Sequence, residues 1–262
     1  MKQPFLSVVI SAFNEENRLP NTLEQIVDFL GQQNYSSEII IVDDGSTDKT
    51  KNFKFPKLKH PITNSLVLHH GTNKGKGAGL RTGVKSATGS YILFSDADNS
   101  TPIEELNNLL PFLCEKLPAK TTLLEQATAN GTFDIAIGSR HLPESNIKIH
   151  QPWHRRLLSR TANLLIQIIL LPGIIDTQCG FKLFKADVAK NIFYGSTIDR
   201  WGFDIEILFI ARKLGYTIKE VPVTWMNSPH SRVRPIKGAL STLKELVQIR
   251  INGWRNRYKK GA

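Results

Sequence analysis

Three acidic clusters, each directly after a predicted strand, are the residues of this chain best suited to chemistry. They are Asn14-Glu15-Glu16, Asp43-Asp44 and Asp96-Ala97-Asp98. The carboxyl ends of parallel strands meet at one edge of a sheet, so these carboxylates are expected to lie close together. Carboxylate oxygens suit Mg²⁺ or Mn²⁺, which keep several waters and also bind substrate phosphates. The sequence therefore predicts a divalent cation at this edge, held by Asp96 and Asp98.

A glycine-rich segment, residues 71–81, is a second candidate for ligand contact. A dinucleotide fingerprint would require glycine where Leu80 stands, and a Walker loop would require Lys76 and Gly77 in the reverse order. Both nucleotide motifs are therefore excluded. What remains is a glycine-rich helix start with basic residues, which a phosphate or a sugar could approach closely.

Nucleophilic and zinc-dependent chemistry is not indicated. The chain contains neither Gly-x-Ser-x-Gly nor His-Glu-x-x-His, and its seven histidines are scattered. Its two cysteines, Cys114 and Cys179, are too few for a disulfide scaffold or a four-cysteine zinc site and fit a reducing compartment. We expect Cys179 to be a small buried residue rather than a reactive thiol.

Alternating strand and helix patterns must position these residues. Short β-branched runs occur at residues 6–10, 38–42, 66–68, 91–94 and 134–137, and helical patterns at 21–30, 77–87 and 102–113. The second half predicts helices at 153–171 and 203–214, strands at 181–184 and 217–221, and a basic C-terminal helix. Because the strands lack polar alternation, they are expected to be covered on both faces. The fold class is therefore α/β, a mostly parallel sheet flanked by helices.

The basic charge of the chain is concentrated at its C-terminus. The net charge is +11, and from Arg232 onward nine basic residues accompany one acid, Glu245. Apolar residues and Trp254 recur at helical spacing among these bases, which is typical of a helix on an anionic membrane surface or of one packed on the core. We expect residues 1–230 to form one domain, with 231–262 a basic amphipathic helix that is part of it or contacts a membrane.

The sequence favours neither nucleic-acid binding, which the charge could suggest, nor a membrane-spanning helix, which the apolar residues could suggest. Nucleic acid would suit the charge, but the acidic sheet edge would repel phosphates and no interleaved aromatic residues occur, so no nucleic-acid partner is expected. The most apolar stretch, residues 164–175, is interrupted by Gln167 and Pro172 and is too short to span a bilayer. The N-terminus lacks a signal-peptide pattern. A peripheral position on the cytoplasmic face of a membrane is the expectation.

Seven motifs together resemble one enzyme family. They are Phe13-Asn14-Glu15-Glu16, Val42-Asp43-Asp44-Gly45-Ser46, Asn73-Lys74-Gly75-Lys76-Gly77, Asp96-Ala97-Asp98, Gly138-Ser139-Arg140, Asp176-Thr-Gln-Cys-Gly-Phe-Lys-Leu-Phe184 and Arg200-Trp-Gly-Phe-Asp-Ile-Glu-Ile-Leu208. With them the chain resembles the family 2 glycosyltransferases of the GT-A fold, nucleotide-diphospho-sugar transferases, from residue 6 to about residue 254. The last two motifs are similar to the polyprenyl-phosphate hexosyltransferases, and most to their glucosyl branch.

The resemblance implies an inverting transfer of glucose from UDP-glucose to a polyprenyl, dolichyl-type phosphate. It assigns the nucleotide sugar to Ser11, Phe13, Glu15, Val42, Asp44, Asp96, Ala97, Arg140 and Arg232. It assigns Mg²⁺ or Mn²⁺ to Asp96 and Asp98, makes Asp98 and Arg140 catalytic, and places the acceptor phosphate at Arg156 and Arg160. The alternatives are GDP-mannose or a UDP-N-acetylhexosamine as donor, or a surface polysaccharide as acceptor.

Two features bear on that choice. A phosphate monoester is largely dianionic at neutral pH, since its second pKa is about 6, so such an acceptor hardly needs a general base. Ser100 stands where mannosyl members of the family place a glutamine, which disfavours mannose. The chain also departs from the family at Ser11, usually proline, at Phe13, usually tyrosine, and at Ser231-Arg232, where a Gly-Ser-Lys pattern is usual.

Overall fold

A computed structural model of the chain describes residues 3–114, 132–149, 153–226 and 235–259, without the side chains of 149, 153–160 and 235–243. The strands are β1 (Leu6–Ala12), β2 (Ser37–Asp43), β3 (Ile62–His69), β4 (Tyr91–Ser95), β5 (Ile135–Ser139), β6 (Asn146–Ile149), β7 (Phe181–Lys185), β8 (Ile218–Pro222) and β9 (Thr224–Met226). The α-helices are α1 (Leu19–Leu30), α2 (Lys76–Ser86), α3 (Leu106–Leu109), α5 (Trp153–Ile169), α6 (Ala186–Gly195), α7 (Phe203–Lys213) and α8 (Pro235–Trp254).

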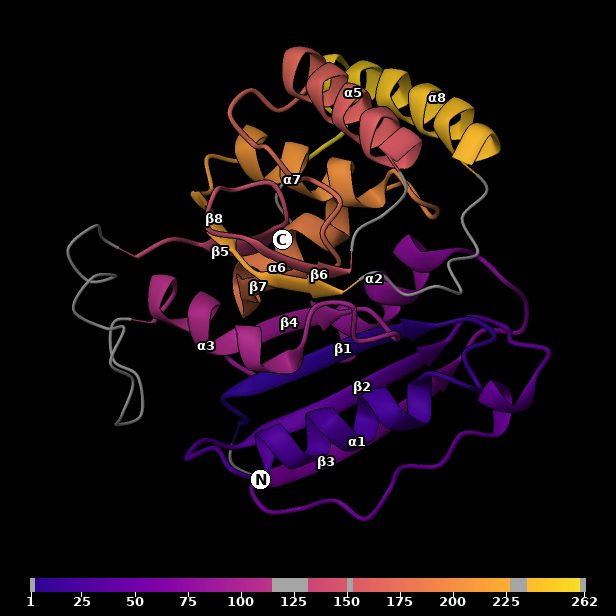
Figure 1. Ribbon diagram of the computed structural model, residues 1–262, viewed down its shortest axis with the longest axis vertical. Helices are drawn as coiled ribbons and strands as arrows, with labels where there is room; N and C mark the ends of the chain where they lie inside the picture. The colour runs from indigo at the N-terminus through magenta and orange to yellow at the C-terminus, as the bar shows by residue number, and fades with distance from the viewer. Residues whose placement is uncertain (1–2, 115–131, 150–152, 227–234, 260–262) are drawn as a thin grey trace.

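The centre of the molecule is a seven-stranded sheet in the order β3-β2-β1-β4-β7-β5-β8 (Figure 1). β1 pairs in parallel with β2 and β4, β2 with β3, and β5 with β8. β7 alone is antiparallel within this sheet, to both β4 and β5. The predicted mostly parallel α/β sheet is confirmed, and β6 and β9 add a separate two-stranded sheet.

Helices cover both faces of the sheet, and alternate strand residues divide between two apolar cores. In β1, Val8 and Ile10 pack with α1 and α3, whereas Val9 packs with α2 and with a layer built from α5, α6, α7 and α8. Because β-branched residues are buried on both faces of these strands, the strands show no polar alternation in the sequence. Figure 1 shows α1 and α3 on one side of the sheet and α6 and α7 on the other.

One predicted helix is interrupted. The segment 102–113 consists of a 3₁₀ turn at Ile103–Glu105, the single turn α3, and a further 3₁₀ turn at Leu110–Phe112. Pro111 has no N–H to donate, and its ring crowds the preceding turn, so a continuous α-helix cannot pass through it. The prediction of one helix over 102–113 is therefore wrong, although its apolar residues are buried as expected.

α8 packs on the sheet's helical layer through polar contacts as well as apolar ones. Glu245 accepts a hydrogen bond from the Gly202 N–H at 2.8 Å. Lys213 Nζ donates to the Gly253 carbonyl at 2.7 Å, and the hydroxyl of Tyr258 donates to Glu206 at 2.9 Å. α5 and α8 lie side by side at the outer end of the molecule (Figure 1). Within the described ranges, no helix has the length and apolar content needed to cross a bilayer.

Candidate active site

The predicted acidic clusters converge at one edge of the sheet. β1, β2, β4 and β5 are all oriented with their carboxyl ends at this edge, because each is parallel to its partner or shares an antiparallel neighbour. The antiparallel β7 begins at the same edge, where Phe181 stands opposite Ser95. The segment before β7, residues 176–180, therefore joins the acidic clusters, as do the first residues of α2 and α7.

Each carboxylate of Asp96 and Asp98 has a cationic partner. Asp96 forms an ion pair with the ammonium of Lys76, the first residue of α2. Asp98 accepts a hydrogen bond from the Ser100 N–H at 3.0 Å, and its other oxygen lies 3.2 Å from a guanidinium nitrogen of Arg18. The two carboxylates thus share a site with two cations, one from α2 and one from the residue before α1.

Glu15 is also tied to this cluster. Both of its carboxylate oxygens accept from Arg18, at 2.6 Å from Nε and 2.5 Å from Nη2. Burial lowers the pKa of the Arg18 guanidinium, but Glu15 and Asp98 outweigh it and hold that pKa above its ordinary value. Burial also lowers the pKa of the Lys76 ammonium, but the carboxylates of Asp96 and Asp204 outweigh that effect, so the pKa of Lys76 is raised. Both cations are charged at neutral pH.

The donor set fits a hard divalent cation that completes its shell with substrate and water. Among the described residues, no group of three His, Cys, Asp or Glu side chains could hold a metal. Two carboxylates with remaining positions for phosphate oxygens and waters are the usual protein contribution to Mg²⁺ in phosphate-binding sites. Gly180 leaves room for the Asp96 carboxylate, because a Cβ built at residue 180 would stand 1.9 Å from Asp96 Oδ2.

Replacing Gly180 with alanine is expected to impair activity without unfolding the protein. The added methyl would force the Asp96 carboxylate to rotate, and a misplacement of about 1 Å can cost on the order of 10²-fold in rate. The measurement is turnover beside thermal unfolding. The matched control is Gly71→Ala, where a built Cβ meets no heavy atom within 4 Å. Equal turnover in the two variants would contradict the importance of this contact.

Asp44 is fully engaged with the segment that follows β3. One oxygen accepts from His70 Nδ1 at 2.7 Å and from the Lys74 N–H at 3.0 Å. The other accepts from Asn73 Nδ2 at 2.9 Å and from the Gly75 N–H at 2.7 Å. Four donors fill the usual acceptor sites of a carboxylate. Asp44 therefore fixes the entry into α2 in this structure, in addition to any ligand role.

The other residues predicted to hold the nucleotide sugar differ in exposure. Phe13 is 37% exposed and Ser11 is half-buried, at the end of β1. The side chain of Val42 is fully buried in the core beneath α2, so it faces no open site. Ala97 is also buried, and its carbonyl accepts from the Thr22 hydroxyl at 2.9 Å. Phe13 is thus the member of this set that presents an apolar surface to solvent.

Arg140, after β5, is held rigidly beside the site. Its Nε and Nη2 donate to the two oxygens of Asp176 at 2.7 and 2.9 Å, and its N–H donates to the same carboxylate at 2.9 Å. The guanidinium also lies over the Trp225 ring, 5.5 Å from its centre. Burial opposes ionisation of Asp176, but Arg140 outweighs it and holds the pKa of that carboxyl far below its usual range. Asp96 contributes to the raised pKa of Arg140, which places the two charges in one electrostatic neighbourhood.

A further ion pair, in which both side chains are buried, lies beneath the site. Lys182 in β7 is fully buried, and its ammonium donates to Asp204 at 2.5 Å and to the Cys179 carbonyl at 2.6 Å. Burial raises the pKa of Asp204, and the attraction of Lys182 and Lys76 opposes that rise. Burial also raises the pKa of Cys179 to about 11, so this thiol is protonated and unreactive at neutral pH, consistent with the sequence expectation.

The glycine-rich start of α2 is occupied by the chain itself. A Cβ at Gly75 would lie 2.3 Å from the Asp199 carbonyl oxygen, and one at Gly77 would lie 2.6 Å from that of Ile198. The N–H groups of Gly77 and Ala78 donate to the same Asp199 carbonyl, at 2.8 and 3.2 Å. The glycines permit this close backbone packing. These two N–H donors are therefore taken up by residue 199 rather than left for a phosphate.

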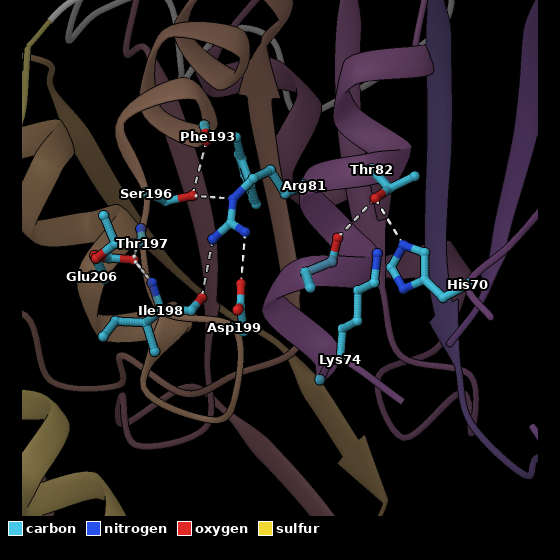
Figure 2. A network of polar contacts seen from close by, with 12 residues as sticks. His70, Lys74, Arg81, Thr82, Phe193, Ser196, Thr197, Ile198, Asp199 and Glu206 are labelled. Atoms are coloured by element: carbon cyan, nitrogen blue, oxygen red, sulfur yellow. Dashed lines mark hydrogen bonds and ion pairs between the residues drawn. The ribbon is translucent and has the colours of Figure 1, made fainter. Parts of the chain in front are cut away.

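Figure 2 shows how the loop 196–199 is fastened to α2. Arg81 Nε donates to Ser196 Oγ at 3.0 Å, and its Nη1 lies 2.7 Å from Asp199 Oδ1. From the other side, the buried carboxylate of Glu206 accepts from the N–H groups of Thr197 and Ile198 at 2.9 and 2.8 Å. This clamp fixes the first turn of α2 and hence the position of Lys76.

Three predicted site residues cannot be placed. Arg156 and Arg160 fall within α5, but their side chains lie outside the described part of the structure. Arg232 lies outside the described residues altogether. Their assignments to phosphates stay predictions.

Several residues around the site received no role from the sequence. They are Arg18, His70, Lys76, Asp176, Lys182 and Asp204. Four of them lie inside motifs that carry the family resemblance, namely Lys76, Asp176, Lys182 and Asp204. A lysine between two apolar residues of a predicted strand, as at Lys182, is a signal for a buried partner. Arg18 and His70 carried no such signal.

A comparison with family models and curated proteins gives a consistent result. Residues 7–193 match the family described as Glycosyl transferase family 2. A dolichyl-phosphate beta-glucosyltransferase of Dictyostelium discoideum is 34% identical over 94% of this chain and 74% of its own length. Proteins of the same name from Homo sapiens and Saccharomyces cerevisiae are each 33% identical, covering 98% and 94% of this chain and 76% and 74% of their own lengths.

Solved structures share the fold at lower identity. Mannosyl-3-phosphoglycerate synthase from Rubrobacter xylanophilus superimposes with a TM-score of 0.64 at 14% identity, over 99% of this chain and 77% of its own. Glucosyl-3-phosphoglycerate synthase from Mycobacterium tuberculosis, solved with Mg²⁺ and uridine diphosphate, gives 0.57 at 17% identity, over 99% and 81%. At this identity the likeness establishes the architecture, a mostly parallel sheet between helices.

Proposed function

This chain belongs to glycosyl transferase family 2, and from that membership we propose that it transfers glucose from UDP-glucose to a polyprenyl phosphate of the dolichyl type. The observation that carries the proposal is the match, at 33–34% identity over nearly the whole chain, to relatives named dolichyl-phosphate beta-glucosyltransferase. The carboxylates and cations at the sheet edge supply the groups that such a transfer requires.

The reaction is a single displacement. An oxygen of the acceptor phosphate attacks the anomeric carbon of the sugar, the bond from that carbon to the diphosphate oxygen breaks, and the nucleoside diphosphate leaves. The anomeric configuration inverts. Since the attacking phosphate is largely dianionic at neutral pH, it needs no side chain to remove a proton. The demand on the protein is to stabilise charge on the leaving diphosphate.

Asp96 and Asp98 would hold the divalent cation. When bound, the cation neutralises charge on the leaving diphosphate. Arg140 supplies a fixed positive charge near the same place, already oriented by Asp176 and Trp225. Solved relatives of the same fold were crystallised with Mg²⁺ or Mn²⁺ and uridine diphosphate, which supports uridine as the donor's base. Phe13 offers an exposed ring for the nucleoside.

A lipid acceptor requires the enzyme to meet a membrane surface, and α5 with α8 supplies a candidate face. Leu164, Leu165, Ile168 and Ile169 are exposed on one side of α5, whereas Ile166 on its other side is fully buried. On α8, Val247 and Trp254 are exposed, with Arg250 stacked over the Trp254 ring. Apolar residues beside aromatic and basic ones are typical of a helix lying in the interface of an anionic membrane.

We therefore propose a peripheral position on the cytoplasmic face of a membrane, with α8 part of the same domain as the sheet. Arg156 and Arg160, in the first half of α5, would then meet the acceptor phosphate at the lipid surface. Arg232 would neutralise the donor diphosphate. These three assignments rest on the family resemblance.

The proposed membrane face predicts a simple loss of binding. Ile168→Glu puts a charge on a side chain that is 69% exposed at the centre of the apolar strip of α5. Burial of one isoleucine is worth about 1.5–3 kcal/mol, so partitioning onto phosphatidylserine-containing vesicles should fall about tenfold or more. Co-sedimentation measures it. The control, Gln32→Glu, adds the same charge at an exposed position after α1 and should bind normally. Equal binding of both variants would contradict the assignment of this face.

The reaction itself is tested by transfer of radiolabelled sugar into the organic phase. Purified protein receives Mg²⁺ or Mn²⁺, a polyprenyl phosphate, and in turn UDP-glucose, UDP-N-acetylglucosamine or GDP-mannose. The proposal expects lipid-soluble label from UDP-glucose alone, lost when EDTA is added. Label from another donor would overturn the choice of sugar. Hydrolysis of sugar nucleotide without any lipid label would overturn the choice of acceptor.

A further inference from the structure

The pairing of the metal-site carboxylates with two cations has a consequence for how the site is filled. Lys76 contacts Asp96 and Arg18 contacts Asp98, so two monovalent cations neutralise the two carboxylates proposed to hold one divalent cation. A divalent cation brings the same total charge as these two. It cannot enter beside them without placing several positive charges at close range.

The two cations are held by the surrounding structure as well as by the carboxylates. Lys76 opens α2, whose first turn is packed against the 198–199 carbonyls, and its ammonium lies 5.6 Å from the centre of the Phe203 ring. Arg18 is fixed by both oxygens of Glu15. Each side chain is long enough to turn away from the carboxylate while its backbone stays in place.

We propose that Lys76 and Arg18 are resident counter-ions of the metal site, which occupy Asp96 and Asp98 until a divalent cation and the donor diphosphate displace them together. The proposal rests on the assignment of Asp96 and Asp98 as metal ligands made under the proposed function. On entry of the divalent cation, the freed ammonium and guanidinium carry charges that the diphosphate of the donor neutralises. Metal and nucleotide therefore bind with positive cooperativity, and metal alone binds weakly.

Counter-ions at these positions also let the protein tolerate its acidic edge before a metal binds. Without counter-ions, two carboxylates two residues apart, with Glu15 nearby, would repel one another and favour opening of this edge. With Lys76 and Arg18 in place the charges alternate from Glu15 through Arg18 to Asp98, and from Asp96 through Lys76 toward Asp204. The cations thus maintain the shape of the site before any ligand arrives.

The test measures Mn²⁺ binding to the full chain, with and without UDP. The electron paramagnetic resonance signal of free Mn²⁺ reports how much of the metal is bound. Lys76→Met should bind Mn²⁺ without UDP at least about tenfold more tightly than the unmodified chain, because the competing charge is removed. UDP should then strengthen binding less than it does in the unmodified chain. The matched control is Lys85→Met, which removes one charge from an exposed side chain in the last turn of α2 and should leave both affinities unchanged.

Thermal unfolding gives a readout independent of activity. In EDTA, Lys76→Met should unfold at a lower temperature than Lys85→Met, and saturating Mn²⁺ should raise its midpoint by more. Arg18→Gln, at a different element, should also tighten binding of Mn²⁺ alone and serves if Lys76→Met does not fold. Mn²⁺ affinity that is unchanged or weaker in folded Lys76→Met or Arg18→Gln would overturn the inference and leave the metal site standing. Absence of Mn²⁺ binding in all variants, with UDP present, would overturn the metal site and this inference together.

Discussion

Asp98→Asn is expected to abolish glucosyl transfer while leaving the protein folded. The amide is a weaker ligand than a carboxylate and carries no charge, so the proposed metal would lose one of its two protein ligands. Stabilisation of the leaving diphosphate by a metal is worth several kcal/mol, which corresponds to a loss on the order of 10³-fold in turnover. Transfer of label to polyprenyl phosphate measures it.

Folding should survive because asparagine preserves the local hydrogen bond. The Ser100 N–H donates to Asp98 Oδ1 at 3.0 Å, and an asparagine carbonyl can accept the same bond. The contact with Arg18 at 3.2 Å is partly exposed, so its loss costs little stability. The control is Asp28→Asn. Asp28 lies on α1, and this variant makes the same chemical change in its exposed ion pair with Lys59. Near-normal turnover in Asp98→Asn would refute the metal assignment.

Lys182→Met is expected to cause the largest loss of stability of any single change considered. It leaves the Asp204 carboxylate buried without its 2.5 Å partner, and breaking a buried ion pair from one side costs about 3–5 kcal/mol. Chemical denaturation at pH 7 measures the loss. In the double variant Lys182→Met with Asp204→Leu, no unpaired charge remains, so most of the stability should return.

The loss should depend on pH in a definite direction. Burial already raises the pKa of Asp204 in the native protein, and removing Lys182 takes away the main interaction that opposes the rise. The native variant then holds a proton on Asp204 where the unfolded chain has lost it, so stability falls as pH rises through the raised pKa. The deficit of Lys182→Met should therefore shrink as pH is lowered toward the ordinary pKa of aspartate. A deficit independent of pH would show that packing alone accounts for it.

The positions of the strands and of the acidic clusters could be predicted because local signals determine them. Continuous β-branched runs indicated strands such as β1 and β2, and the rule that parallel strands end at one edge brought Asp44, Asp96 and Asp98 together. Motifs around Arg140 and Asp176 placed both residues in the family pattern. Periodicity failed at 102–113, where the apolar spacing was helical but Pro111 prevented a continuous helix.

What could not be predicted depends on contacts between distant parts of the chain. Lys182 and Asp204 meet only because the antiparallel β7 brings one beside the first turn of α7. Nothing local indicates the direction of β7, since the residue pattern of a five-residue strand does not distinguish parallel from antiparallel pairing. Arg18 reaches Asp98 across 80 residues, and Gly75 and Gly77 are explained by close packing against the 198–199 backbone rather than by a phosphate.

The position of β7 also bears on how the chain folds. β3, β2, β1 and β4 form one run of paired strands and β5 with β8 another, and β7 is the strand that joins them. During synthesis the inner edge of β4 stays unpaired until residues 181–185 emerge, some 90 residues later in the chain. This long-range pairing is slow to form and leaves an aggregation-prone edge meanwhile. A chain truncated before residue 180 would therefore expose that edge and would also lack Gly180, which packs against the Asp96 carboxylate.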